Sequence, residues 1–244
     1  MTIFLSKEKT FAFSIAGEKH LETSEKNQDA CFNCEYKDYS LLAVADGVGS
    51  SKHPRMASKK AIRSLIATTS HFVGKNFSDS EFINFFEKHF HRWCFIPRRH
   101  LATTLLFAIV YSNSNVVIGQ AGDGLIQSSF NGRSMTFKKK NDDFTNLTHA
   151  LRADRKYAHW SFSQKTINTP GTLNLLLCTD GISEDLISDS IPSFQEKLIA
   201  QMMDQNEKDI ADLVSNWPVR GSTDDKSIAL GSFTFEQGTN QNAI

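Results

Sequence analysis

The sequence has no excess of charge of either sign and no long apolar run. Its 244 residues include 27 Lys or Arg and 27 Asp or Glu, so the formal net charge at pH 7 is zero. Nucleic-acid-binding domains usually carry a basic excess, so we expect no nucleic-acid partner. No apolar run approaches the about 18 residues of a membrane helix. Charges at Lys7, Glu8 and Lys9 stand where a signal peptide would be apolar. We therefore expect a soluble, cytoplasmic protein without a membrane partner.

Cysteine is also scarce, with four residues in the chain. Cys31 and Cys34 form a CxxC pair, which can bind zinc or perform redox chemistry. No second CxxC and no nearby histidine pair accompanies it. Both cysteines fall in a predicted strand, three residues apart, and would point to opposite faces. We interpret the cysteines as ordinary reduced residues.

Short apolar runs rich in β-branched residues predict strands along the whole chain. Two pairs of these runs are separated only by the polar segments KDYS and SNS, which predicts two antiparallel hairpins. The predicted strands are 10–17, 30–36, 41–45, 102–111, 115–122, 173–178 and 227–235.

Apolar residues at three-to-four spacing predict helices between these strands. Ser193 and Glu196 have the spacing of a capping box, so one helix is expected to begin there. The aromatic stripe of residues 82–93 is interpreted as core packing. Strands and helices in this order predict an α+β protein with separate layers, and we see one domain over residues 1–244. The predicted helices are 55–73, 79–95, one starting at 193, and 208–217 before Pro218.

Acidic residues recur at the ends of the predicted strands. Asp46, Asp123 and Asp180 each follow an apolar run and precede a glycine, while Asp29 and the pair Asp224–Asp225 stand just before strands. Taken singly, each is explained as a turn residue. In antiparallel sheets, however, the end of one strand lies beside the start of its neighbour, so these carboxylates can gather at one rim. Five such junctions together favour a shared site.

Gathered carboxylates repel one another and shift each other's pKa. Hard divalent cations remove this penalty, and all-oxygen ligation selects Mg²⁺, Mn²⁺ or Ca²⁺ over zinc. A glycine after each aspartate lets the backbone turn sharply and expose its carbonyl. Two such ions about 4 Å apart can lower the pKa of a bridging water and clamp a phosphoryl group.

The segments NQDA, VADGVG, ATTLLFAIV, GQAGDG, LLLCTDGI and GSTDDKSIAL, in this order, resemble the metal-dependent protein Ser/Thr phosphatases of the PPM, or protein phosphatase 2C-like, family. The resemblance extends from about residue 12 to 235. It is greatest to the compact bacterial branch, whose first motif corresponds here to Gly17, His20 and Gln28–Ala30. It implies a four-layer α-β-β-α sandwich, with two central antiparallel β-sheets flanked by helix pairs, and a variable flap at about 131–170 beside the active site.

The resemblance also implies two Mn²⁺ or Mg²⁺ ions. Asp46 would bridge them with help from the Gly47 carbonyl, Asp180 and Asp224 would complete one shell, and Asp29 would reach the other ion directly or through water. Asp123 matches an aspartate that, with Asp180, can hold a weaker third ion. Asp225, where many relatives carry Asn, is the second choice for the ligand at this pair.

By the same resemblance, metal-bound hydroxide attacks phosphorus in line, and Asp46 and Asp180 act catalytically through the metal-bound water. The chain lacks the arginine that many relatives place before the first aspartate to hold the substrate phosphate. We expect His20 or Lys26 to substitute, with a structural role for His20 as the alternative. Basic residues of the flap, Lys138–Lys140, Arg152, Arg155 and Lys156, either attract acidic substrates or form a solvated surface.

The leading hypothesis is a Mn²⁺/Mg²⁺-dependent phosphoprotein Ser/Thr phosphatase, a phosphoric monoester hydrolase. Its partners would be a phosphorylated protein and a bacterial Ser/Thr kinase or its targets, and we expect a monomer. One alternative is a non-catalytic regulatory or binding module on the same fold. Another is a phosphatase of small phosphorylated metabolites. Retention of Asp29, Asp46, Asp180 and Asp224 favours the active enzyme.

Overall fold

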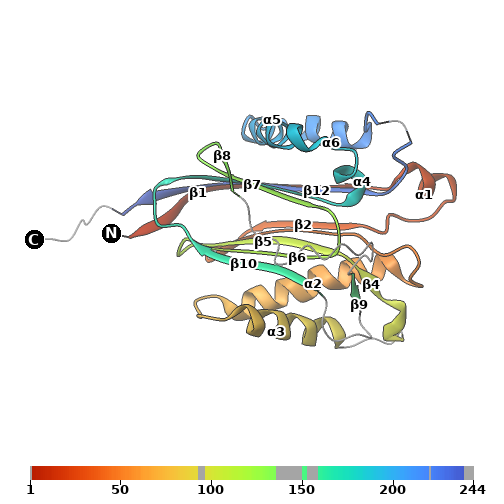
Figure 1. The fold of residues 1–244 in the computed structure, drawn as a ribbon, viewed down its shortest axis with the longest axis horizontal. Helices are drawn as coiled ribbons and strands as arrows, with labels where there is room; N and C mark the ends of the chain where they lie inside the picture. The colour runs from red at the N-terminus through yellow and green to blue at the C-terminus, as the bar shows by residue number, and fades with distance from the viewer. Residues whose placement is uncertain (1, 93–96, 136–149, 153–158, 220, 239–244) are drawn as a thin grey trace, which may run out of the picture.

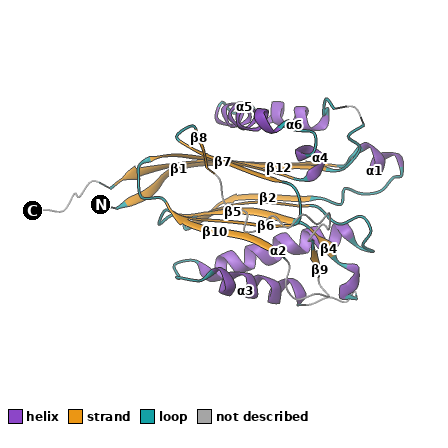
Figure 2. Cartoon of the chain, in the orientation of Figure 1, coloured by secondary structure: helices purple, strands orange, loops and turns teal. Residues whose placement is uncertain are grey.

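The computed structural model describes residues 2–92, 97–135, 150–152, 159–219 and 221–238. Two five-stranded antiparallel sheets lie face to face, and helices cover the outer face of each (Figures 1 and 2). Helices α5 (Ile191–Met203) and α6 (Glu207–Ser215) cover one sheet, and α2 (Pro54–Phe72) and α3 (Asp79–His91) cover the other. This arrangement confirms the predicted α+β sandwich.

The first sheet joins the two ends of the chain, and the second contains both predicted hairpins. The hairpins pair β2 with β3 and β5 with β6, antiparallel as expected. In spatial order the first sheet contains β1 (Ile3–Ile15), β12 (Lys226–Gln237), β11 (Gly171–Cys178), β7 (Leu125–Phe130) and β8 (Arg133–Met135). The second contains β10 (Trp160–Thr166), β6 (Asn115–Ala121), β5 (Leu105–Tyr111), β3 (Tyr39–Ala45) and β2 (Ala30–Glu35). A small ladder pairs β4 (Ala102–Thr103) with β9 (Leu151–Arg152).

Three apolar cores hold the layers together, one between the two sheets and one under each helix pair. In β3, Leu42 and Val44 face the opposite sheet, while Leu41 and Ala43 face α2 and α3. Both faces of the strand are buried, which explains its continuous apolar sequence. Cys31 and Cys34 pack against different cores, as their spacing predicted. Phe82, Phe86 and Phe90 of the aromatic stripe are buried in the core under α2 and α3.

The predicted start of α5 is wrong. The helix begins at Ile191, two residues earlier, and Ser193 lies inside it, donating from Oγ to the carbonyl of Ser190 at 2.9 Å. Pro192 in the first turn explains this start, because proline has no N–H to leave unsatisfied there. The capping box that does form joins Ser78 and Glu81 at the start of α3.

The structure also contains elements that the apolar runs did not predict. Two short helices, α1 (Glu18–Glu22) and α4 (Asp180–Ser183), lie at the end of the sandwich away from the chain termini (Figure 1). Two 3₁₀ turns occupy Arg98–His100 and Ser188–Ser190. No helix of the described residues is long and apolar enough to cross a membrane.

Half of the expected flap at about 131–170 falls outside the described residues, including Lys138–Lys140, Arg155 and Lys156. Its last part does not belong to a flap, because Trp160–Thr166 forms β10 and pairs with β6 along its whole length. For the residues before this strand, a flap stays a prediction.

Candidate metal and phosphate site

Strand register brings the acidic residues of the second sheet to one end. Ala30 pairs with Ala45, so Asp29 and Asp46 flank the same end of the β2–β3 hairpin. Asp123 follows β6 in the turn that leads to β7, where the chain crosses from the second sheet to the first.

The first sheet brings its own acidic residues to the same place. Cys178, the last residue of β11, pairs with Ile228 on one side and with Leu125 on the other. Asp180 after β11, the pair Asp224–Asp225 before β12 and Asp123 before β7 therefore lie at the same end of this sheet. The predicted convergence of the strand-end aspartates is what this topology produces.

Asp29 is more deeply buried than Asp46, Asp123, Asp180 or Asp224, with 4% of its surface exposed. Its Oδ2 accepts a hydrogen bond from Thr179 Oγ1 at 2.8 Å, whereas its Oδ1 is buried with no hydrogen-bond partner. Burial, followed by repulsion from Asp46, raises the pKa of Asp29 well above its usual value. A buried carboxylate oxygen without a donor is a position where a cation would be stabilising.

Asp46 is held at the tip of β3 by backbone contacts with the β4–β5 segment. Its N–H donates to Thr104 Oγ1 at 2.9 Å, and its carbonyl accepts from the Thr104 N–H and from Thr103 Oγ1, both at 2.7 Å. Burial and the charges of Asp224 and Asp123 raise the pKa of Asp46 to about 6. The backbone of Asp46 is thus held in position, and the carboxylates around it disfavour the charge of its side chain.

Gly47 has no room for a side chain. A Cβ there would stand 2.4 Å from the Pro54 carbonyl oxygen and 2.9 Å from the Gln28 carbonyl oxygen. The first turn of α2 therefore packs directly on the Asp46–Gly47 turn. This close approach places the start of α2 beside the carboxylates.

Asp180 is the first residue of α4, and the charges of the other acidic residues act on its side chain. Its Oδ1 accepts the Gly181 N–H at 2.9 Å. Burial, followed by the charges of Asp46, Asp123 and Asp224, raises its pKa to about 7. Carboxylates of both sheets thus act on one another across the site.

The adjacent aspartates 224 and 225 have different surroundings. Asp225 is 2% exposed, and its Oδ1 accepts hydrogen bonds from the Gly17 N–H and His20 Nδ1, both at 2.8 Å. Its Oδ2 accepts the Gln28 N–H at 2.6 Å. Asp224 is exposed; its Oδ1 accepts the Asp225 N–H at 2.8 Å, and its backbone carbonyl accepts Lys226 Nζ at 2.9 Å. Both oxygens of Asp225 are engaged in internal bonds, which leaves Asp224 as the better placed ligand of this pair.

His20 is enclosed in the same network. Its Nδ1 contacts Asp225, and its Nε2 lies 3.0 Å from Gln28 Nε2 and 3.4 Å from Glu25 Oε2. Both ring nitrogens therefore have partners, so the ring braces the loop that carries Gln28 and Asp29. Lys26, the other predicted phosphate-binding residue, is exposed on that loop.

The donor chemistry fits divalent cations that prefer oxygen ligands. The proposed donors are carboxylates and a backbone carbonyl, one buried oxygen lacks a partner, and burial together with mutual repulsion raises the pKa values of Asp29, Asp46 and Asp180. Among the described residues, no three His, Cys, Asp or Glu side chains are already grouped closely enough to hold an ion.

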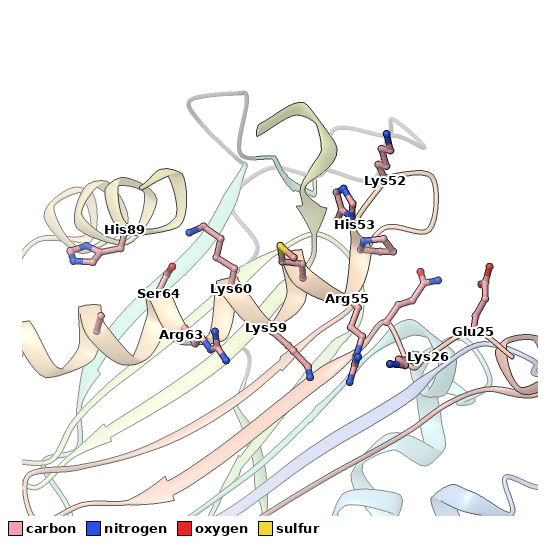
Figure 3. Close-up of a pocket in the computed structure, with 14 residues that line it drawn as sticks. Glu25, Lys26, Lys52, His53, Arg55, Lys59, Lys60, Arg63, Ser64 and His89 are labelled. Atoms are coloured by element: carbon pink, nitrogen blue, oxygen red, sulfur yellow. The ribbon is translucent and has the colours of Figure 1, made fainter. Parts of the chain in front are cut away.

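The sequence analysis overlooked basic residues beside this site. Arg55, Lys59 and Arg63 project from one side of α2 into a groove of about 860 Å³ that Gln28 also lines (Figure 3). The same three side chains line a second hollow of about 530 Å³ together with Asp29. In the sequence these three residues are four apart within the predicted helix 55–73, a spacing that places them on one face of the helix.

The sequence of this chain matches the model of one known protein family. The model of the protein phosphatase 2C family matches residues 16–216, which is most of the chain. The chain belongs to the protein phosphatase 2C family. Members of this family are in general metal-dependent phosphatases that use Mg²⁺ or Mn²⁺. A search of curated proteins finds no match.

Solved protein phosphatase 2C structures show the same fold at low sequence identity. RsbX in complex with magnesium is 15% identical, with a TM-score of 0.61 over 95% of this chain and 100% of that chain. The SpoIIE phosphatase domain from Bacillus subtilis is 14% identical, with a TM-score of 0.56 over 98% and 96%. The serine/threonine phosphatase of S. agalactiae is 16% identical, with a TM-score of 0.60 over 92% and 99%.

Proposed function

We propose that this protein is a Mn²⁺- or Mg²⁺-dependent phosphatase of phosphoserine and phosphothreonine in proteins. The observation that carries the proposal is the meeting of five carboxylates from two sheets at one edge, in a chain of the protein phosphatase 2C family. The substrate would be a phosphoprotein, with a bacterial Ser/Thr kinase acting on the same targets.

The ions would be held by oxygen atoms alone. Asp46 with the Gly47 carbonyl, Asp180, Asp224 and Asp29 would hold two ions, and Asp123 with Asp180 a third. When bound, the ions supply activation of a water molecule and neutralise charge on the transferring phosphoryl group. Asp225 does not join them as a ligand but keeps the loop of Gln28 and Asp29 against the start of β12.

The residues of the chain position these ligands. Thr179 donates to Asp29 and so fixes the orientation of that carboxylate, and Thr103 and Thr104 fix the Asp46 backbone. For the substrate phosphate, Arg55 is better placed than His20, because it lines the hollow with Asp29 and has the planar fork that matches phosphate oxygens. Lys26 would supply a second positive charge from the opposite loop.

Hydrolysis with and without metal tests the proposal. We would assay an aryl phosphate and a phosphothreonine peptide with Mn²⁺, with Mg²⁺ and with chelator. Asp46→Asn keeps the shape of the side chain but removes its charge, so it should lower metal-dependent kcat/KM by at least about 100-fold. Asp189→Asn, the same change on an exposed aspartate of the Ser188–Ser190 turn, is the control and should retain wild-type activity.

Peptide turnover that exceeds aryl phosphate turnover would support a protein substrate over a small metabolite. A folded wild type without turnover in any metal would contradict the enzyme. That result would favour the regulatory module, which the missing arginine before Asp29 would then help to explain.

A further inference from the structure

The groove beside the carboxylates is strongly basic although the chain as a whole is neutral. It is lined by six Lys or Arg side chains and one carboxylate, that of Glu25. The cations, which define the basic groove, are Lys26, Lys52, Arg55, Lys59, Lys60 and Arg63. With equal numbers of acidic and basic residues in the chain, this concentration is local.

The positive charges of the basic groove are not neutralised by the protein. Within the described part of the chain, none of the six cations forms an ion pair with a carboxylate. Lys60 Nζ donates to the Arg92 carbonyl at 2.6 Å. Arg55, Lys59 and Arg63 are exposed along the helix. Uncompensated charges in a concave surface attract a ligand of opposite sign.

The basic groove begins at the candidate metal site. Gln28 lines the groove, and the next residue is Asp29. Ser58 of α2 donates to the Gln28 carbonyl at 2.6 Å, which ties the helix to this loop. A bound peptide that runs from the carboxylates along α2 would therefore pass Arg55 first, then Lys59, then Arg63.

The spacing of these cations matches an extended peptide. Residues four apart on a helix are separated by about 6 Å along its axis. In an extended chain, alternate side chains lie on the same face and are about 6.6 Å apart. Two or three acidic side chains at alternate positions could thus meet Arg55, Lys59 and Arg63 in turn (Figure 3).

We propose that the basic groove binds an acidic segment of the phosphoprotein substrate, next to its phosphorylated residue. The proposal rests on the proposed function for the position of the phosphate, but the groove itself can be tested without catalysis. Acidic side chains at alternate positions would be selected, and segments with neutral flanks would bind weakly.

Binding to labelled peptides in the presence of chelator is the experiment. Two phosphothreonine peptides would differ only in their flanks, with glutamate or glutamine at alternate positions. By fluorescence anisotropy at low salt, we expect the wild type to bind the acidic peptide at least about tenfold more tightly, and added salt to reduce this preference.

The double variant Lys59→Glu/Arg63→Glu should abolish this preference, because it replaces attraction by repulsion at exposed positions. Lys197→Glu, an exposed lysine on α5 in the opposite helix layer, is the matched control and should keep it. Circular dichroism and the melting temperature check that both variants fold. In peptide hydrolysis, the loss in the double variant should fall on KM rather than on kcat.

Three results would overturn the acidic-segment assignment. They are a wild type that does not distinguish the peptides, a double variant that still does, and a short nucleic-acid duplex that binds the groove more tightly than the acidic peptide. Failure of the phosphatase itself would look different. The peptide preference would remain and depend on Lys59 and Arg63, while no aryl phosphate or peptide would be hydrolysed with any metal.

Discussion

Asp224 and Asp225 show how neighbouring residues of one type can take unrelated roles. Asp225 faces inward just before β12 and accepts three hydrogen bonds, from Gly17 before α1, from His20 in α1 and from Gln28 in the loop between α1 and β2. Asp224 faces outward and stays available to a ligand. The family resemblance ranked Asp224 before Asp225 as a ligand, but the structural role of Asp225 was not predictable from TDDKS, because it arises from contacts about 200 residues away in the sequence.

Substitution of the two residues should separate stability from metal binding. Asp225→Ala leaves buried donors on Gly17, His20 and Gln28 without an acceptor, so metal-free stability should fall by about 2–4 kcal/mol. Asp224→Ala removes one acceptor, that of the Asp225 N–H, but on an exposed side chain that the other carboxylates repel, and it should leave metal-free stability within about 1 kcal/mol of wild type. Urea unfolding in chelator measures both. Equal losses in the two variants would contradict the structural role of Asp225.

The placement of the strand-end aspartates at one end of the sheets was predictable from the sequence. Asp46, Asp123 and Asp180 each end an apolar run, and antiparallel pairing brings such ends together. The partners that hold them were not predictable, since Thr179, Thr103 and Thr104 act through contacts between separate elements. The phosphate-binding candidate Arg55 was overlooked for the same reason, because only the packing of α2 brings it to Asp29.

At the scale of elements, the contact between α2 and the β3 turn decides where the basic groove lies. Gly47 allows the Pro54 carbonyl to approach so closely that no Cβ fits between them. The helix can therefore begin beside Asp46 and run away from it with its cations on one side.

Alanine at Gly47 tests this packing. Gly47→Ala places a methyl group 2.4 Å from backbone atoms of Pro54, so the helix must move, and stability should fall by about 2–4 kcal/mol. Gly49→Ala is the control two residues away, where the nearest atom would be 3.8 Å distant, and it should change stability by less than about 1 kcal/mol. Chemical unfolding of both variants provides the measurement. A stability of Gly47→Ala equal to that of Gly49→Ala would refute the close contact.

Periodicity predicted most of the large elements but not their limits. The predicted helices at 55–73 and 79–95 correspond to α2 and to α3, and the predicted hairpins form. Strands β7 and β10 were missed because their sequences mix polar and apolar residues. β10 is an edge strand of its sheet, and β7 has only the three-residue strand β8 on its outer side. The start of α5 was predicted two residues too late, because Ser193 and Glu196 have the spacing of a capping box. The helix begins at Ile191 instead, with Pro192 in its first turn.

At the scale of the whole molecule, a neutral chain separates its charges at one end of the sandwich. The carboxylates of five strand ends lie at the edge shared by the two sheets, and the cations of the basic groove run along α2 from this edge. A phosphorylated acidic segment would place its phosphate on the ions and its carboxylates along the groove. The formal net charge of zero reveals neither the acidic edge nor the basic groove.

We propose that this acidic edge holds divalent metal ions. Calorimetric titration with Mn²⁺ measures this binding itself. Below a pKa of about 6 for Asp46 and about 7 for Asp180, protons occupy the carboxylates and compete with the metal. Apparent affinity should therefore rise from pH 5.5 to pH 8, with proton release on binding.

The same titration distinguishes the site from incidental binding. We predict at least two Mn²⁺ ions per wild-type chain at pH 8, unchanged binding in Asp189→Asn, and loss of the tight binding in Asp46→Asn. Absence of Mn²⁺ binding by the folded wild type, or binding by Asp46→Asn that equals it at both pH values, would contradict the account.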